Sequence, residues 1–177
     1  VIRRLKQPPF INQLNESDRR LRNEADLAEL KKRLSATAAE AGRDVYLKAI
    51  RAQPADHRLY EGFAEFLEAR NELGEAVQQW ERVASFIPHH HLAWFKSGSL
   101  LLRQGKLAEA RPRLTHAVEL RPDLSEGWLE LGRLETAQGQ LEAALVDYGR
   151  AREQMPGDAR VYYWRGKAWS RMNRRAE

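Results

Sequence analysis

The 177-residue chain contains no cysteine, which excludes thiol catalysis, disulfide bonds and thiolate metal sites, and allows a reducing compartment. Proline and glycine are sparse, at seven and eleven residues, while Ala, Leu, Glu and Arg dominate, a composition that favours helix. No run of about 18 apolar residues occurs, so we expect no membrane-spanning helix. The start, VIRRLKQPPF, lacks both an initiator Met and an apolar signal core. We interpret it as a fragment boundary and expect a cytoplasmic protein.

Sequence motifs of catalysis are also missing. There is no phosphate-binding G-x-x-x-x-G-K loop, no dinucleotide glycine fingerprint, no H-E-x-x-H and no G-x-S-x-G. Three consecutive histidines, His89, His90 and His91, raise the question of a metal site. Adjacent residues in a turn point in different directions, whereas metal ligands on one helix recur at i, i+4. We therefore expect a solvated turn, with no metal, no cofactor and no enzymatic activity.

The charge is unevenly distributed. The net charge is +5, but residues 150–177 hold eight Lys/Arg against three Asp/Glu, and residues 1–34 hold nine against five. The intervening residues are mildly acidic. Two interpretations stay open: the basic ends face an anionic partner, or they are solvated helix faces.

A fixed period organises the chain. Pro54, Pro88, Pro122 and Pro156 are separated by 34 residues each time, which indicates a repeat array. We number each unit so that position 1 is His57, His91, Ser125 or Ala159, which places an aromatic residue at position 4. Position 4 is aromatic (Tyr60, Trp94, Trp128 and Tyr162), and position 8 is small (Ala64, Gly98, Gly132 and Gly166). Position 20 is alanine (Ala76, Ala110 and Ala144), and position 24 is large and apolar (Trp80, Leu114 and Tyr148).

Each unit also has a residue at position 15 that tolerates the left-handed conformation: Asn71, Gly105 or Gly139. Apolar residues on both sides recur at helical spacing. The pattern predicts a helix, a short turn, a second helix and a terminal proline. Small residues at positions 8 and 20 let the two helices approach closely, and we expect the aromatic residues to fill the space between hairpins. Pro112 lies inside a predicted second helix, where we expect a late start or a kink.

These positions resemble the tetratricopeptide repeat family, most clearly in LAWFKSGSLLLRQGKLAEARPRLTHAVELRP and EGWLELGRLETAQGQLEAALVDYGRAREQMP. The resemblance covers about residues 37–177. It implies an all-α fold, an α-solenoid of helix–turn–helix repeats forming a right-handed superhelix whose first helices line a concave groove. We divide the chain into an extended segment (1–15) and one repeat domain (16–177). Its parts are an atypical capping repeat (16–54), three full repeats (55–88, 89–122 and 123–156) and a C-terminal half repeat or cap helix (157–177).

The N-terminal part departs from the repeat pattern. Residues 16–34 predict an amphipathic helix that caps or overhangs the array. Residues 37–53 keep the pattern of a second helix, with Tyr46 at position 24 and Ala49 at position 27. The preceding Thr37-Ala-Ala-Glu40 predicts a capping box that begins this helix.

The resemblance implies that positions 2, 5, 9, 12 and 13 of the first helices line the groove. In chain order, these positions run from acidic, through apolar, to basic. This gradient suits an extended or helical partner segment with an apolar anchor near Phe95 and Leu129 and an acidic stretch near Arg133, Arg160, Lys167 and Arg171. The chaperone-tail clamp of some relatives needs Lys and Asn where this chain has Glu61 and Glu65, so we do not expect a chaperone C-terminus as ligand. The candidate groove residues are Arg58, Glu61, Glu65, Leu92, Phe95, Ser99, Arg103, Leu129, Arg133, Arg160, Tyr163, Lys167 and Arg171.

The sequence thus predicts a protein-interaction scaffold whose partner is a peptide segment or the acidic surface of an assembly. The chain, including QPPFINQLN, is also similar to bacterial tetratricopeptide proteins labelled kinesin light chains, which implies association with a tubulin-like filament. Eukaryotic kinesin light chains use a repeat longer than 34. Three alternatives stay open: the basic ends bind an anionic membrane or, less favoured, nucleic acid; the chain is an accessory domain of a larger protein; or the N-terminal helix fills the groove.

Overall fold

The computed structural model describes residues 24–176, and all regular secondary structure among them is helical. The predicted all-α fold of tandem helix–turn–helix units is confirmed. The chain divides into two compact units, with the boundary between Lys48 and Ala49, and we call the second of them, which holds the tandem helix pairs, the repeat unit. The helices are α1 (Glu24–Ala52), α2 (His57–Ala69), α3 (Leu73–Phe86), α4 (His91–Arg103), α5 (Leu107–Leu120), α6 (Ser125–Gln138), α7 (Leu141–Gln154) and α8 (Ala159–Ala176).

The N-terminal helix α1 differs from the prediction. It continues without interruption through Thr37, so the predicted capping box and the helix start at that residue are wrong. The Thr37 hydroxyl donates to the carbonyl oxygen of Arg33, 3.0 Å away, which is a bond inside a helix. The alanine-rich sequence around Thr37 favours helix strongly enough to override the cap signal. Residues 1–15 and the start of the predicted helix 16–34 lie outside the described residues.

Three left-handed residues separate the paired helices, as the sequence predicts. Asn71, Gly105 and Gly139 have φ angles of 61°, 76° and 77°. The Gly139 N–H donates to the carbonyl oxygen of Thr136, which satisfies one of the carbonyl groups left free at the end of α6. The 34-residue period therefore fixes where each hairpin turns.

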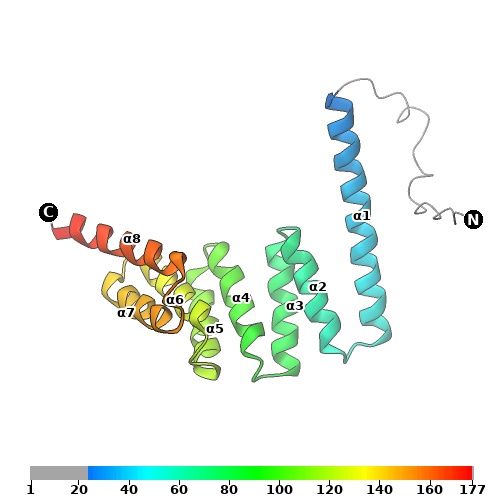
Figure 1. Cartoon of the computed structure of the whole chain (residues 1–177). Helices are drawn as coiled ribbons and strands as arrows, with labels where there is room; N and C mark the ends of the chain where they lie inside the picture. Colours follow the sequence, from blue (N-terminus) through cyan, green and yellow to red (C-terminus); the bar gives the residue numbers. More distant parts are fainter. Residues whose placement is uncertain (1–23, 177) are drawn as a thin grey trace, which may run out of the picture. The chain divides into compact units, whose positions relative to one another are not determined.

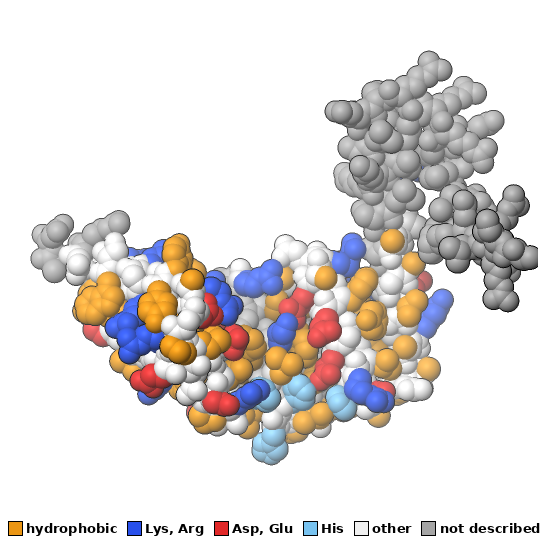
Figure 2. Space-filling model, in the orientation of Figure 1, with side chains coloured by type: hydrophobic (Ala, Val, Ile, Leu, Met, Phe, Trp, Pro, Cys, Tyr) orange, Lys and Arg blue, Asp and Glu red, His pale blue; other side chains and the backbone are white. Residues whose placement is uncertain are grey.

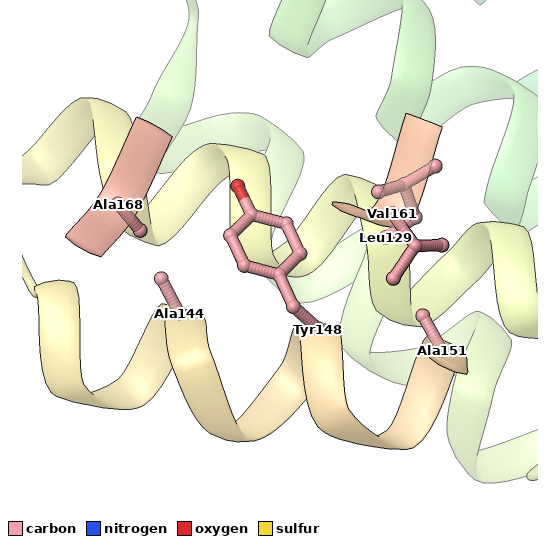
Figure 3. Close-up of a cluster of buried hydrophobic side chains, with 6 residues drawn as sticks. All are labelled: Leu129, Ala144, Tyr148, Ala151, Val161 and Ala168. Carbon is pink, nitrogen blue, oxygen red and sulfur yellow. The ribbon is translucent and has the colours of Figure 1, made fainter. Parts of the chain in front are cut away.

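In the repeat unit, each helix packs against its neighbours in the chain, as Figure 1 shows for α2–α8. The close approach depends on small residues. A Cβ atom on Gly98 would lie 2.8 Å from Cγ of Leu114, and one on Gly132 would lie 2.5 Å from Cε1 of Tyr148. Figure 3 shows the second contact region, where Tyr148 is buried between α6, α7 and α8. Bulk at position 8 would push the paired helices apart.

The position-4 aromatics do more than fill space. Each is only partly buried and uses its polar atom to bond the carbonyl oxygen of the proline six residues earlier. The distances from donor to carbonyl oxygen lie between 2.7 and 3.0 Å, in the pairs Tyr60–Pro54, Trp94–Pro88, Trp128–Pro122 and Tyr162–Pro156. In all four units, position 4 thus combines an aromatic ring with an N–H or O–H donor.

Pro112 lies inside α5, which begins at Leu107, so the predicted late start is wrong. The proline has no N–H to donate to the carbonyl group of Ala108. Ala110 and Leu114 are fully buried on either side of it, and this packing holds the helix together despite the missing hydrogen bond.

Candidate functional site

His89, His90 and His91 lie where α3 connects to α4, in what we call the histidine turn. His90 is the N-cap of α4: its Nδ1 accepts a hydrogen bond from the Ala93 N–H at 3.2 Å, and its Nε2 lies 3.0 Å from Oε1 of Glu61 on α2. His91 Nε2 lies 3.1 Å from a guanidinium nitrogen of Arg121, and burial together with the Arg121 charge lowers the pKa of His91. Within residues 24–176, no group of three or more His, Cys, Asp or Glu is placed to hold a metal ion. Figure 2 shows histidine side chains along one edge of the repeat unit.

At the first repeat, the predicted acidic groove residues are largely engaged. Glu61 is bonded to His90, and Glu68 accepts from the Trp80 indole at 2.6 Å and pairs with Lys96 at 3.2 Å. Glu65 is exposed on α2. The acidic character of this end of the groove is therefore weaker than the residue types imply.

Arg58 and Arg160 occupy position 2 of the first and last repeats, and each pairs with the aspartate just before its own helix. Arg58 pairs with Asp56 at 2.8 Å, and Arg160 pairs with Asp158 through several hydrogen bonds. The arginine side chain lowers the pKa of each of these aspartates, mainly through hydrogen bonding. Arg58 and Arg160 thus serve local structure as well as surface charge.

The apolar middle of the predicted groove is divided between surface and core. Leu92, Phe95 and Ser99 are half-buried on α4, and Arg103 donates to the side-chain oxygen of Asn71 at 3.2 Å. Leu129, by contrast, is only 3% exposed and belongs to the cluster that joins α6, α7 and α8. Its prediction as a partner contact is corrected, since Val161 and Ala168 of α8 pack into the same cluster.

The basic end forms a coherent site. Arg133, Lys167 and Arg171 line a cavity of about 400 Å³ together with Trp164. The Arg133 guanidinium carbon lies 4.8 Å from the centre of the Trp164 ring, and Lys167 Nζ lies 4.7 Å from it. Arg171 donates to the carbonyl oxygen of Thr136 at 2.8 Å, which fixes its side chain across α6. The remaining lining residues are Leu102, Gly105, Leu107, Thr136 and Ala137.

The cavity is electrostatically positive. Arg133 pairs with Glu130 at 2.7 Å, whereas no carboxylate within the described part of the chain is paired with Lys167 or Arg171. Burial raises the pKa of Glu130, and the Arg133 charge opposes this shift. The Nε atom of Arg133 is buried without a hydrogen-bond partner. An anionic group in the cavity would therefore meet two cations that have no carboxylate to neutralise them.

Trp164 is the central residue that the prediction of the groove missed. It occupies position 6 of the last unit, where the earlier units have Gly62, Lys96 and Glu130. The sequence signal was the run Tyr162-Tyr163-Trp164, in which three adjacent aromatics cannot all occupy one helix face. Tyr163 is 62% exposed and contacts Trp164 edge to face, with ring centres 5.3 Å apart. Together the two rings form an apolar floor beside Lys167.

Comparison with known proteins agrees with this architecture. The family model for the tetratricopeptide repeat matches residues 95–159. DnaJ homolog subfamily C member 3 from Bos taurus is 28% identical over 90 residues, which is 51% of this chain but only 18% of that protein. The chain thus matches less than a fifth of the length of the curated relatives.

Solved structures show the same fold. The crystal structure of MamA superposes with a TM-score of 0.72 at 16% identity, over 86% of each chain. YrrB, described as a TPR protein with an unusual peptide-binding site, gives a TM-score of 0.67 at 23% identity, over 78% of this chain and 72% of its own. None of the helices among residues 24–176 is both long and apolar enough to cross a membrane.

Proposed function

Because the chain is a tetratricopeptide-repeat protein, we propose that it is a non-enzymatic scaffold that holds a segment of a partner protein in the groove of its first helices. The observation that carries this proposal is the convergence of Arg133, Lys167 and Arg171 around Trp164. Cations beside an aromatic face recognise a carboxylate next to an apolar side chain. YrrB, which has the same fold, is a peptide-binding protein.

The direction of the partner segment follows from the chemistry of the groove. Its acidic residues lie over Lys167 and Arg171, and an apolar residue next to them contacts Trp164 and Leu102. Farther along the groove, the segment passes Phe95 and Leu92 on α4 and reaches Glu65 on α2. The most favourable partner carries acidic side chains at one end only, since Glu65 repels them at the other.

Binding of designed peptides tests this proposal. The probes are a fluorescent peptide with Leu followed by three Glu and a matched peptide with Lys in place of Glu. The full chain should bind the acidic peptide at least about tenfold more tightly, and the difference should shrink as salt is raised. K167E combined with R171E should abolish this preference, while R82E, an exposed charge reversal on α3, should not change it. Equal binding by the groove variant and the wild type would refute the groove as the site.

A tubulin-like filament is the specific partner that the resemblance to bacterial kinesin-light-chain-labelled proteins implies. Such a filament presents an acidic surface, which fits the positive cavity. Co-sedimentation of the chain with polymerised bacterial tubulin homologue, compared with its K167E/R171E variant, tests this identity separately. If the wild-type chain does not co-sediment with the filament but still binds the acidic peptide, the filament is rejected and the groove is kept; co-sedimentation that only the variant loses supports the filament.

A further inference from the structure

A buried glutamate stands where the two preceding repeats have leucine. Glu135 of α6 occupies position 11, and the equivalent residues are Leu67 of α2 and Leu101 of α4. All three side chains are buried, and Glu135 is only 8% exposed. Burying a carboxylate is unfavourable unless hydrogen bonds and opposite charges replace its contacts with water, whereas leucine has no such requirement. The chain thus departs from its own repeat pattern at position 11, in a way that packing does not explain.

Hydrogen bonds satisfy only one of the two carboxylate oxygens of Glu135. Oε1 accepts from Arg111 at 3.3 Å, whereas Oε2 is buried and has no hydrogen-bond donor among the described residues. Asp147 of α7 is the second acid of the pair, and its Oδ1 accepts from Arg150 at 3.1 Å. Both arginine side chains are far more exposed than the two carboxylates, so they approach from the solvent side. One buried oxygen of the acid pair is therefore left without a donor.

A proton on Asp147 supplies that donor only in acid. Burial, reinforced by the Glu135 charge, raises the pKa of Asp147 to about 6, and the protonated carboxyl lies within hydrogen-bonding reach of Glu135. At pH 8 this proton is lost. Another donor, carrying a positive charge, would then stabilise the pair.

The acid pair lines a cavity of about 480 Å³. One wall is apolar and includes Leu131 and Trp128 of α6. The charged lining residues are three carboxylates and two guanidiniums, so one added positive charge would neutralise them. These residues are Glu119, Glu135, Asp147, Arg111 and Arg150, and the remaining lining residues are Thr115, Val118 and Pro122.

An alkylammonium group fits this lining better than a divalent metal ion does. Across the described helices, no three or more His, Cys, Asp or Glu are grouped to hold a metal, and the two guanidiniums repel a double charge. An ammonium group has one charge and three N–H donors. Its carbon chain can pack along an apolar wall while the charged end reaches a carboxylate.

We propose that this cavity binds an alkylammonium group, whose nitrogen donates to Oε2 of Glu135 and whose carbon chain lies against Leu131 and Trp128. A lysine side chain of a partner protein and a small free amine share this chemistry. None of the residues that line the cavity around Trp164 belongs to this one, so the site lies outside the proposed groove and does not depend on it.

Titration of the full chain at pH 8 tests the site. The probes are n-butylammonium chloride, which reproduces the lysine side chain, and n-butanol, which has the same apolar chain without the charge. Nuclear magnetic resonance follows the Trp128 indole N–H and the Leu131 methyl groups. Butylammonium should bind at least about tenfold more tightly than butanol. E135L, which restores the leucine of the other repeats, should abolish this preference.

Conservative variants separate the charge from the packing. E135Q keeps the size of the side chain and should weaken butylammonium binding at least about fivefold. E142Q makes the same change at an exposed position of α7 and should leave the affinity within about twofold. E135L should melt at or above the wild-type temperature, because leucine needs no partner at this position. Equal affinity for the two probes, or an affinity that a folded E135Q variant retains, would overturn the proposal.

A second pair of probes identifies the source of the ammonium group. A peptide capped at both ends carries Leu-Lys-Leu, and its matched peptide has norleucine in place of lysine. Lysine-peptide binding at least about tenfold tighter than that of butylammonium, and lost with norleucine, supports the site with a partner lysine as its occupant. Butylammonium binding without peptide binding supports the site with a free amine as its occupant. Equal binding of the two peptides, with no preference for butylammonium over butanol, would again overturn the proposal.

Discussion

The indole N–H of Trp94 donates a hydrogen bond to the carbonyl oxygen of Pro88, 2.8 Å away and six residues earlier in the chain. The same bond recurs at every repeat boundary from Pro54 to Pro156. It ties the start of each first helix to the turn that precedes it, and so links the aromatic and the proline of the repeat pattern through a physical contact. This hydrogen bond thus recurs with the same 34-residue period as the sequence pattern.

Substitution of Trp94 by Phe tests that bond. The variant keeps a ring beside His116, which Trp94 contacts edge to face at 4.9 Å, but loses the donor. We expect W94F to lower the free energy of unfolding by about 1 kcal/mol. W94A should cost about 3 kcal/mol, because it also loses the apolar contacts of the ring. Urea denaturation of both variants measures the difference; equal losses in W94F and W94A would show that the hydrogen bond, not the ring, accounts for the stability.

Two helical glycines should respond to alanine in opposite directions. A Cβ on Gly132 would lie 2.5 Å from the ring of Tyr148, which is fully buried and whose hydroxyl lies 3.0 Å from the Thr136 hydroxyl. The ring cannot yield easily, so G132A should cost about 1–3 kcal/mol. Gly149 has no atom within 4 Å, and G149A should stabilise by about 0.5–1 kcal/mol through helix propensity. Thermal melts that shift in the same direction for both variants would contradict this account of the packing.

The repeat pattern predicts those features that recur with the same environment in each unit. Asn71, Gly105 and Gly139 end their helices because every hairpin needs a left-handed residue at the same place. Gly98 and Gly132 lie at close helix contacts because each of these hairpins brings its two helices together at the same place. These positions could be predicted from the sequence, because the same surroundings recur in successive hairpins.

Features that depend on a neighbouring helix could not be predicted in the same way. Phe95 and Leu129 share position 5, yet Phe95 is half-buried, while Leu129 is enclosed by residues of α7 and α8. Trp164 became part of the cavity only because Arg133 of α6 lies over its ring. Thr37 shows the converse, since a local cap signal was overridden by the helix that runs through it. Packing between elements, which the period does not encode, decided each case.

Substitution of His90 and of His89 tests whether the histidine turn stabilises the fold or is only solvated. His90 caps α4 and bonds Glu61, whereas His89 is exposed. H90A should lower the free energy of unfolding by about 1 kcal/mol, since an N-cap bond is lost, while H89A should change it by less than about 0.5 kcal/mol. Chemical denaturation at pH 7 compares them, and equal stability of the two variants would assign His90 to the solvated turn that the sequence predicts.

A buried pair of acids joins α6 to α7 and makes stability depend on pH. Asp147 and Glu135 are both less than a tenth exposed, and burial, reinforced by the Glu135 charge, raises the pKa of Asp147 to about 6 from 3.8. Arg150 and Arg111 pair with the two carboxyl groups from their outer sides. The folded chain therefore holds a proton that the unfolded chain releases more readily. The free energy of unfolding should therefore fall as pH rises from about 4 to about 6, and the contribution of Asp147 should not change further at higher pH.

Substitution by Asn isolates the effect. D147N carries no ionisable proton, so it should melt at a higher temperature than the wild type at pH 8, and this advantage should vanish as pH falls below about 4. D158N is the control of opposite sign, because hydrogen bonding to Arg160 lowers the pKa of Asp158. D158N should melt below the wild type at pH 8, and its deficit should shrink in acid as Asp158 of the wild type becomes protonated. Melting curves at pH 2, 4, 6 and 8 decide the matter: a D147N advantage that does not change with pH would mean that folding leaves the pKa of Asp147 unshifted, because Arg150 offsets the cost of its burial.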